Sequence, residues 1–249
     1  MEYTAEMGEY VVDDADLCAD IFRRIEKRKY PRRALKLEHD MAWLMAKQER
    51  NGFKFDEQAA CQLHATLSRE RAELDSKLIT TFGCWYEPDK TANKDKLPET
   101  NIKVCIPKRT LNYTDPFRAS RIKGVPFTAI KRIEFNPGSR QHIAKRLIKK
   151  YGWTPAEFTD KGSIKVDEEV LSKLPYPEAK LASQYLTVRK LLGQLSEGEN
   201  AWLKSVRNGF IHGSVNPNGA VTGRATHSRP NIGQVPSTRA YYGKEARAL

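Results

Sequence analysis

Apolar residues of this chain recur mainly at three- and four-residue spacing, and this constrains the fold more than any other feature. Such spacing places apolar side chains on one face of a helix, whereas a half-buried strand would alternate them. The pattern predicts helices over residues 12–28, 35–50, 56–81, 139–151 and 167–174, and from 177 to 206 with a bend or break at Gly193 and Gly198. We therefore expect a mainly α fold.

Residues 84–126 interrupt this pattern. Prolines recur there without a sustained apolar period, and nine Lys and Arg residues lie between Asp89 and Val125 against four acids. Proline and the lack of period predict a basic, loop-rich insertion between helices. Cys105 lies between two β-branched residues, which favours one short strand at that point.

The chain changes character again after Asn208. Residues 210–215 alternate between apolar and polar, residues 216–219 read Asn-Pro-Asn-Gly, and residues 220–222 return to apolar and β-branched types. Two short extended runs around such a turn predict a C-terminal β-hairpin, with 220–222 as its returning strand.

Charge points to an anionic partner. The chain has a net charge of +12, although its first twenty residues contain seven acids and no base. A strongly basic body suggests a polyanion, most simply nucleic acid, and an unspecialised basic protein is the alternative. Four widely spaced cysteines without a C-x-x-C pair, no secretory leader pattern and no apolar run of membrane-spanning length favour the cytoplasm, without a membrane partner.

The segment 213–236 is rich in groups that suit nucleic acid. Gly223 allows close approach of the backbone to a ligand, and Arg224 follows with a planar fork of donors. Hydroxyl, imidazole and amide side chains come next, at Thr226, His227, Ser228, Asn231 and Gln234. These groups suit phosphate oxygens and minor-groove acceptors. The alternative is a polar surface loop in which Arg224 binds backbone carbonyls.

This segment resembles the first polymerase-domain motif of family A DNA polymerases, the DNA polymerase I class. The shared pattern is T-G-R-x-(S/T)-x-x-x-P-N-x-x-(Q/N)-(I/V)-P, and the likeness is greatest to replicative polymerases of podophages. Residues 37–52, 135–141 and 185–198 resemble, in order, the helix entering the polymerase domain, the step after the thumb tip, and the second long thumb helix with its following turn.

The resemblance implies a domain order and a fold. Residues 1–33 would be the tail of a 3'-5' exonuclease domain, 34–208 the thumb, and 209–249 the start of the palm, including its hairpin. The thumb would consist of long antiparallel helices with the basic insertion 84–126 at its tip. In podophage polymerases a loop at this place binds host thioredoxin as a processivity factor, so thioredoxin is a candidate partner. The alternative is a basic loop that touches DNA directly or has no specific role.

The resemblance also implies a set of residues that bind primer–template DNA. In the family, the arginine matching Arg224 reaches into the minor groove near the primer terminus. The implied set is Arg224, Thr226, His227, Asn231, Gln234, Asn216, Asn218, His212, Arg189, Lys190, Gln194 and Ser196. For Arg189 and Lys190, a solvated helix face is the alternative.

Tyr10 and Asp14 fit the Y-x-x-x-D pattern of proofreading exonucleases. Residues four apart share a helix face, so the hydroxyl and the carboxylate would converge. In the family this aspartate binds a divalent metal and the tyrosine orients the attacking water. Here the other two exonuclease motifs are absent, so Asp14 would bind metal only with carboxylates from elsewhere, and an ordinary surface helix is the alternative.

Two palm aspartates hold Mg²⁺ in the intact family enzyme, and neither their motif nor the fingers occurs in these residues. We therefore expect a section of a DNA-directed DNA polymerase, either truncated or a subunit of a split enzyme. The alternative is a non-enzymatic DNA-binding or processivity module. We predict no polymerase activity from this chain alone, so Mg²⁺-dependent primer extension by the purified chain would contradict that prediction.

Overall fold

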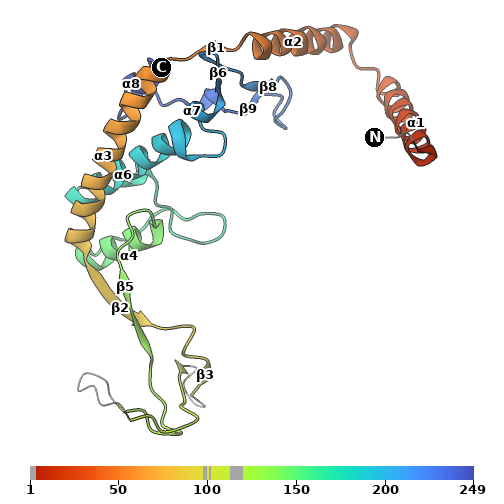
Figure 1. Ribbon diagram of the computed structural model, residues 1–249. Coiled ribbons are helices and arrows are strands. Elements are labelled where there is room, and N and C mark those ends of the chain that lie inside the picture. The colour runs from red at the N-terminus through yellow and green to blue at the C-terminus, as the bar shows by residue number, and fades with distance from the viewer. Residues whose placement is uncertain (1–3, 98–99, 101, 113–119) are drawn as a thin grey trace. The chain divides into compact units, whose positions relative to one another are not determined.

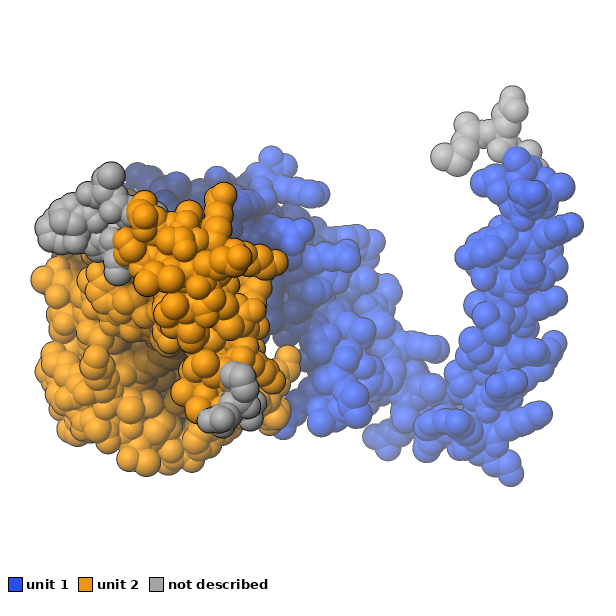
Figure 2. Space-filling model, turned by 90° about the horizontal axis from the view of Figure 1, so that it is seen from below, with its two compact units in different colours: residues 1–64, 193–249 blue, residues 65–192 orange. Residues whose placement is uncertain are grey.

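A computed structural model describes residues 4–97, 100, 102–112 and 120–249. The chain divides into two compact units, residues 1–64 with 193–249 and residues 65–192 (Figure 2). About half of the chain is helical, and its strands form small antiparallel sheets (Figure 1). The coarse prediction of a mainly helical chain with short strands is therefore confirmed.

The first unit combines two N-terminal helices with the C-terminal strands. Its elements are α1 (Ala5–Lys27), α2 (Arg32–Asn51), β1 (Phe53–Lys54), η1 (Gly193–Glu197), α7 (Trp202–Ser205), β6 (Val206–Arg207), β7 (Phe210–Ile211), β8 (Ser214–Asn216), β9 (Thr226–Ser228), η2 (Ile232–Gln234), α8 (Gly243–Arg247) and the first turns of α3 (Glu57–Phe82). Strand β7 lies between β1 and β6 in an antiparallel sheet, and β8 pairs with β9.

The second unit contains the rest of α3 and the central helices. Its other elements are β2 (Cys84–Pro88), β3 (Asp95–Lys96), β4 (Lys103–Val104), β5 (Ile130–Glu134), α4 (Arg140–Tyr151), α5 (Glu168–Ser172) and α6 (Pro177–Leu192). Its core is built from apolar side chains of these helices, among them the fully buried Leu67, Leu78, Ile143, Leu147, Leu171 and Val188. The predicted apolar stripes of α3 and α6 therefore face this core.

Local hydrogen bonds cap both ends of α4. The Ser139 hydroxyl accepts the backbone N–H of His142 at the start of α4, and Gly152 ends that helix in the left-handed conformation at φ 64°. Helix α1 begins earlier than predicted, because the Thr4 hydroxyl caps it by accepting the N–H of Met7. None of the residues of α1 or α2 is buried.

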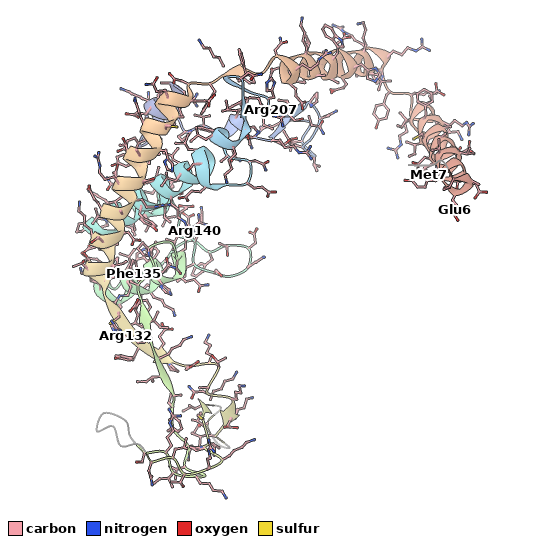
Figure 3. All side chains as sticks on the ribbon, viewed as in Figure 1. Glu6, Met7, Arg132, Phe135, Arg140 and Arg207 are labelled. Atoms are coloured by element: carbon pink, nitrogen blue, oxygen red, sulfur yellow. The ribbon has the colours of Figure 1, made fainter. Side chains whose placement is uncertain are left out.

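The insertion is joined to its unit through a two-stranded ribbon that the sequence did not predict. Strand β2 pairs with β5 from Cys84 opposite Glu134 to Pro88 opposite Ile130, and Figure 3 labels Arg132 on β5 and Phe135 just after it. The short strand predicted at Cys105 is observed as β4, which ends at Val104, and Cys105 continues it with an isolated bridge to Phe127. Residues 98–99, 101 and 113–119 of the insertion lie outside the described part.

The C-terminal hairpin forms, but the prediction of its second strand was wrong. Asn216 pairs with Thr226 and Ser214 with Ser228, so the returning strand lies after residues 220–222. The N–H of Ala220 donates to the Arg224 carbonyl at 3.1 Å, and the N–H of Gly223 donates to the Ala220 carbonyl at 2.8 Å. These local bonds hold residues 220–224 in a turn, which Gly223 permits with φ at +73°.

The four cysteines are free thiols, and Cys18, Cys61 and Cys84 are exposed. Among the residues that the structure describes, no helix has both the length and the apolar character needed to cross a bilayer.

A buried carboxylate joins α4 to α6. Glu178 is 8% exposed, its Oε1 accepts from the Lys150 ammonium at 2.5 Å, and its Oε2 accepts from the Tyr151 hydroxyl. Burial raises the pKa of the Glu178 carboxyl group, but the hydrogen bonds from Lys150 and Tyr151 lower it by more, so the pKa lies below its ordinary value. The same contact with Glu178 raises the pKa of Lys150.

We predict that Glu178→Gln destabilises the chain in a pH-dependent way. Because the carboxyl pKa is lower in the folded than in the unfolded chain, its stabilisation is complete above the unfolded pKa and is lost as the pH falls through the folded pKa. In urea unfolding followed by circular dichroism, the variant should be less stable at about pH 7, and the difference should shrink at about pH 3. The exposed Glu169, paired with Lys173, provides the matched Glu169→Gln control, for which we expect little change. An equal loss at both pH values for Glu178→Gln would contradict the prediction.

Candidate nucleic-acid interface

A polar cavity in the first unit brings together three of the predicted DNA-binding residues. Gln194 of η1, Asn231 and Gln234 line a cavity of about 450 Å³, together with Arg229 and Asn200. The Gln194 side chain donates through Nε2 to the Gln234 backbone carbonyl at 3.4 Å. The sequence segments around residues 194 and 231–234, forty residues apart, therefore form one surface of donors and acceptors.

The end of α6 explains how Gln194 reaches this cavity. After Leu192 the helix widens into the π-helical turn η1, and the N–H of Gly198 donates to the Gly193 carbonyl at 2.9 Å. A Cβ atom at Gly198 would come within 2.6 Å of that carbonyl oxygen, so a side chain is excluded there. The predicted break at the two glycines is confirmed, and Ser196 is half-buried in the same turn.

Two buried polar atoms of this region have no hydrogen-bond partner within the described chain. They are Oε1 of Gln194 and Nδ1 of His227. Buried polar atoms in native proteins are nearly always hydrogen-bonded, and an orphaned one costs about 1–3 kcal/mol. Both atoms belong to residues of the predicted DNA-binding set, so they are available to a ligand or to water.

The hairpin carries the exposed members of the set. Arg224, Thr226, Asn216 and Asn218 are exposed, and the Asn216 side chain orders the turn by accepting the N–H of Asn218 at 3.1 Å. The turn passes so close to β9 that a Cβ atom at Gly219 would lie 1.9 Å from the Thr226 hydroxyl oxygen. The hairpin therefore presents Arg224 on a turn whose path is fixed by small residues.

The ring of His212 contacts the backbone of this chain at the end of α2. Its Nδ1 lies 2.8 Å from the Glu49 carbonyl oxygen at the end of α2, and a Cβ atom at Gly52 would lie 2.9 Å from its Cε1. The ring thus packs against the exit of α2. Its predicted contact with DNA remains a prediction.

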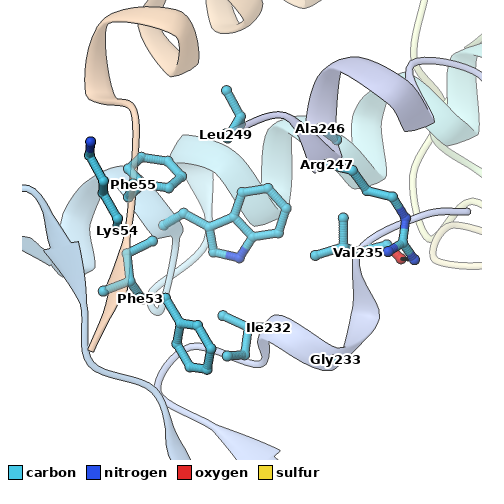
Figure 4. Close-up of a pocket in the computed structure, with 11 residues that line it drawn as sticks. Phe53, Lys54, Phe55, Ile232, Gly233, Val235, Ala246, Arg247 and Leu249 are labelled. Carbon is cyan, nitrogen blue, oxygen red and sulfur yellow. Dashed lines mark hydrogen bonds between the residues drawn. The ribbon is translucent and has the colours of Figure 1, made fainter. Parts of the chain in front are cut away.

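An apolar cavity of about 460 Å³ is lined on one side by the motif segment (Figure 4). Phe53, Phe55 and Trp202 line it together with Ile232 and Val235 of the motif. Phe55 and Trp202 meet edge to face with ring centroids 6.5 Å apart. Arg247 of α8 donates to the backbone carbonyls of Pro236 at 2.6 Å and Val235 at 3.3 Å. These contacts anchor the end of the motif.

Arg189 and Lys190 belong to the second unit, where both are exposed on α6. The Arg189 guanidinium donates to the Gly138 carbonyl at 2.9 Å, and a Cβ atom at Gly138 would lie 2.3 Å from its Nη1. Arg189 therefore connects α6 to the step before α4. Lys190 is exposed at the next position, which fits both the predicted contact with DNA and the alternative of a solvated helix face.

Tyr10 and Asp14 lie four residues apart on α1, and both are exposed. Their shared helix face is confirmed, while their catalytic role stays a prediction. In the part of the chain that the structure describes, no group of three or more His, Cys, Asp or Glu residues lies close enough to hold a metal ion. Asp14 therefore has no partner carboxylates for a metal ion among those residues.

Arg229 and Asn200 are polar cavity residues that the sequence analysis missed. Arg229 is exposed at the mouth of the cavity, next to the buried Pro230. Arg229 lies inside the motif segment, so its positive charge there could have placed it in the predicted DNA-binding set. Asn200 follows the break after η1 and had no such signal, because its place depends on the path of the chain through residues 193–200.

Comparison with known proteins agrees with this arrangement. The sequence model of the family described as "DNA polymerase family A" matches residues 119–249, which include the hairpin and both cavities' motif residues. The chain is 42% identical over 242 residues to a DNA-directed DNA polymerase of Enterobacteria phage T3, and 41% identical over 242 residues to one of Escherichia phage T7. Each alignment covers 86% of this chain and 34% of the relative, so the chain spans about a third of their length.

A solved structure shares the fold. It is the POL domain of Pol1 from M. smegmatis in complex with DNA primer-template and dNTP, with a TM-score of 0.53 and 17% sequence identity. The likeness covers 85% of this chain and 28% of that one. Because the family model covers just over half of the residues, the chain belongs to DNA polymerase family A.

Proposed function

We propose that this chain binds primer–template DNA as part of a DNA-directed DNA polymerase. The observation that carries the proposal is the polar cavity, where Gln194, Asn231 and Gln234 meet beside an exposed arginine hairpin. The unpartnered Gln194 Oε1 supports a ligand at that place. The T3 and T7 relatives carry the name DNA-directed DNA polymerase, which supports the same activity for the enzyme to which these residues belong.

The chemistry of this surface suits duplex DNA that is recognised by its shape and not by its base sequence. Residues 201–249 carry seven basic side chains and one acid, Glu245, so the local field favours phosphates. Amides and an arginine can meet the minor-groove acceptors that every base pair presents, so such contacts do not depend on sequence. This property is what a copying enzyme requires of the surface that holds its product.

We assign the parts of the chain as the resemblance implied. Residues 34–208 would act as the thumb, with α3 and α6 as its long helices, and residues 209–249 would begin the palm. Residues 1–33 would be the tail of an exonuclease domain. Arg189 and Lys190 would contact phosphates from α6, which agrees with their exposure.

We predict that Arg224→Ala weakens binding of a primer–template duplex by roughly 1–3 kcal/mol. Arg224 is exposed on the hairpin turn, so its loss removes a contact with DNA and no buried side chain. If about five phosphates are neutralised, the logarithm of the binding constant should fall against the logarithm of salt with a slope of roughly −4 to −5. Because a minor-groove contact releases no phosphate counterion, Arg224→Ala should leave this slope nearly unchanged.

Fluorescence anisotropy with a labelled duplex measures both quantities. Arg32→Ala, which removes an exposed arginine of α2 outside the motif, is the matched control and should keep the affinity of the unsubstituted chain. Unchanged affinity in Arg224→Ala would return Arg224 to a structural role, and a slope near zero in the unsubstituted chain would defeat the DNA-binding proposal.

The insertion supports a second, protein partner. Within its described residues, Ile102, Ile106, Ile122 and Val125 are exposed apolar side chains on an otherwise basic segment. A contiguous group of exposed apolar side chains is typical of protein-binding surfaces. The Cys105–Phe127 bridge and the bond from the Val125 N–H to the Ile122 carbonyl bring Ile106, Ile122 and Val125 into one part of the insertion. We propose thioredoxin as the partner of residues 84–126.

We predict that thioredoxin forms a complex with this chain in isothermal titration calorimetry, and that Ile122→Asp together with Ile106→Asp abolishes it. A charge at these positions would have to be desolvated in the complex. Val221→Asp is the control, because Val221 is fully exposed outside the insertion. No heat of binding with the unsubstituted chain, or equal loss in the control, would remove thioredoxin as the partner.

A further inference from the structure

Arg229 is a cation of the motif segment that has no role among the contacts proposed for DNA. It is exposed and lines the polar cavity to which Gln194 also belongs. Among the described residues that line this cavity, no other side chain is charged. Glu197 and Glu199 flank the lining residue Gly198 in the sequence, but they do not line the cavity themselves. The mouth of the cavity therefore carries a positive charge that no lining carboxylate offsets.

The Arg229 guanidinium keeps all of its donors for a ligand. Within the described part of the chain, no hydrogen bond, ion pair or ring contact joins its side chain to another residue. Arg247 of the same unit differs, because it donates to the backbone carbonyls of Pro236 and Val235. Arg247 thus stabilises the fold, whereas the planar fork of Arg229 is open to an acceptor from outside the chain.

The backbone at Arg229 has a conformation that side-chain-bearing residues seldom adopt. Its φ is 57°, in the left-handed region that glycine favours. The next residue, Pro230, is fully buried, and a Cβ atom at Gly213 would lie 3.0 Å from the Pro230 carbonyl oxygen. Residues that their surroundings hold in this region cluster at functional sites and ligand clamps. Packing therefore fixes the base of the Arg229 side chain, while its charged end remains exposed.

The chemistry of Arg229 suits a phosphate better than a base edge. A guanidinium matches a phosphate with two parallel hydrogen bonds. Arginine that reads a base in the major groove selects guanine, whereas every nucleotide has a phosphate. A surface that holds DNA of any sequence therefore gains from an arginine on the backbone. Arg224 precedes β9 and Arg229 follows it, so the strand separates the two positions.

We propose that Arg229 binds a backbone phosphate of the primer–template duplex at the mouth of the polar cavity. This inference rests on the proposed function, because it assigns one further contact to the same duplex. It gives Arg229 a role distinct from that of Arg224. A phosphate contact releases a counterion from DNA, and a contact with the minor groove does not.

The salt dependence of duplex binding tests this role. In fluorescence anisotropy, Arg229→Ala should reduce the slope of log K against log salt by about 0.9. The loss of affinity should therefore be about eightfold at about 0.1 M salt, about threefold at about 0.3 M, and vanish toward about 1 M. Arg229→Lys keeps a charge for the phosphate and should keep most of the slope. Arg32→Ala removes an equal charge from an exposed position of the same unit and should leave the slope unchanged.

Each competing outcome is distinct. A loss of affinity that is equal at every salt concentration, as expected for Arg224→Ala, would assign Arg229 to a base and overturn the phosphate contact. Unchanged affinity in Arg229→Ala would overturn it too, as would an equal loss of slope in Arg32→Ala, since the effect would then be one of net charge. A slope near zero in the unsubstituted chain would overturn the DNA-binding proposal together with this contact.

The substitutions leave the backbone comparable. Alanine and lysine carry a Cβ atom as arginine does, so neither variant changes the strain at a φ of 57°. Arg229 is exposed, and circular dichroism verifies that its variants are folded.

Discussion

The arrangement of the candidate interface depends on the packing of the buried Trp202 indole. The residue is 5% exposed and lines both cavities of the first unit, the apolar one with Phe55 and the polar one with Gln194 and Asn231. One aromatic side chain thus separates a hydrophobic interior from a surface of amides. A buried ring fixes its surroundings through close packing, so the polar groups on its other side are held without many hydrogen bonds among themselves. Their donors and acceptors consequently remain available to a ligand.

The two units meet different physical demands. In the second unit, buried leucine and isoleucine side chains and the Glu178–Lys150–Tyr151 cluster stabilise a helical core. In the first unit, short strands, glycine turns and small helices hold a polar segment in an irregular path. Irregular segments place side chains where regular elements do not, and functional residues concentrate on them for this reason. The match to the family A model includes residues of both units, because it covers the helices from α4 onward as well as the motif segment.

Elements governed by local chemistry were predictable from the sequence, and elements governed by distant pairing were not. The helices predicted over residues 139–151 and 56–81 are encoded by apolar spacing within a few residues, and α4 and α3 confirm them. The β2–β5 ribbon joins residues more than forty positions apart and left no local signal beyond Trp85 and Tyr86. The returning strand was misplaced because residues 220–222 have strand composition, while the bond between Ala220 and Arg224 continues the turn. For the interface, residue types indicated Asn231 and Gln234 and the family resemblance added Gln194, but the contact of Arg189 with Gly138 and the place of Asn200 required the folded chain.

The ribbon that carries the insertion has a consequence for how such chains diversify. Cys84 and Glu134 lie opposite one another, so the chain leaves the helices of the second unit and returns to them at adjacent points, whatever lies between. The entropy of closing a loop grows only with the logarithm of its length. Segments of different length and composition can therefore replace one another beyond the β2–β5 ribbon with little strain on the helices of the second unit. A lineage that retains the ribbon is free to acquire, shorten or replace an accessory module while the rest of the chain keeps its sequence.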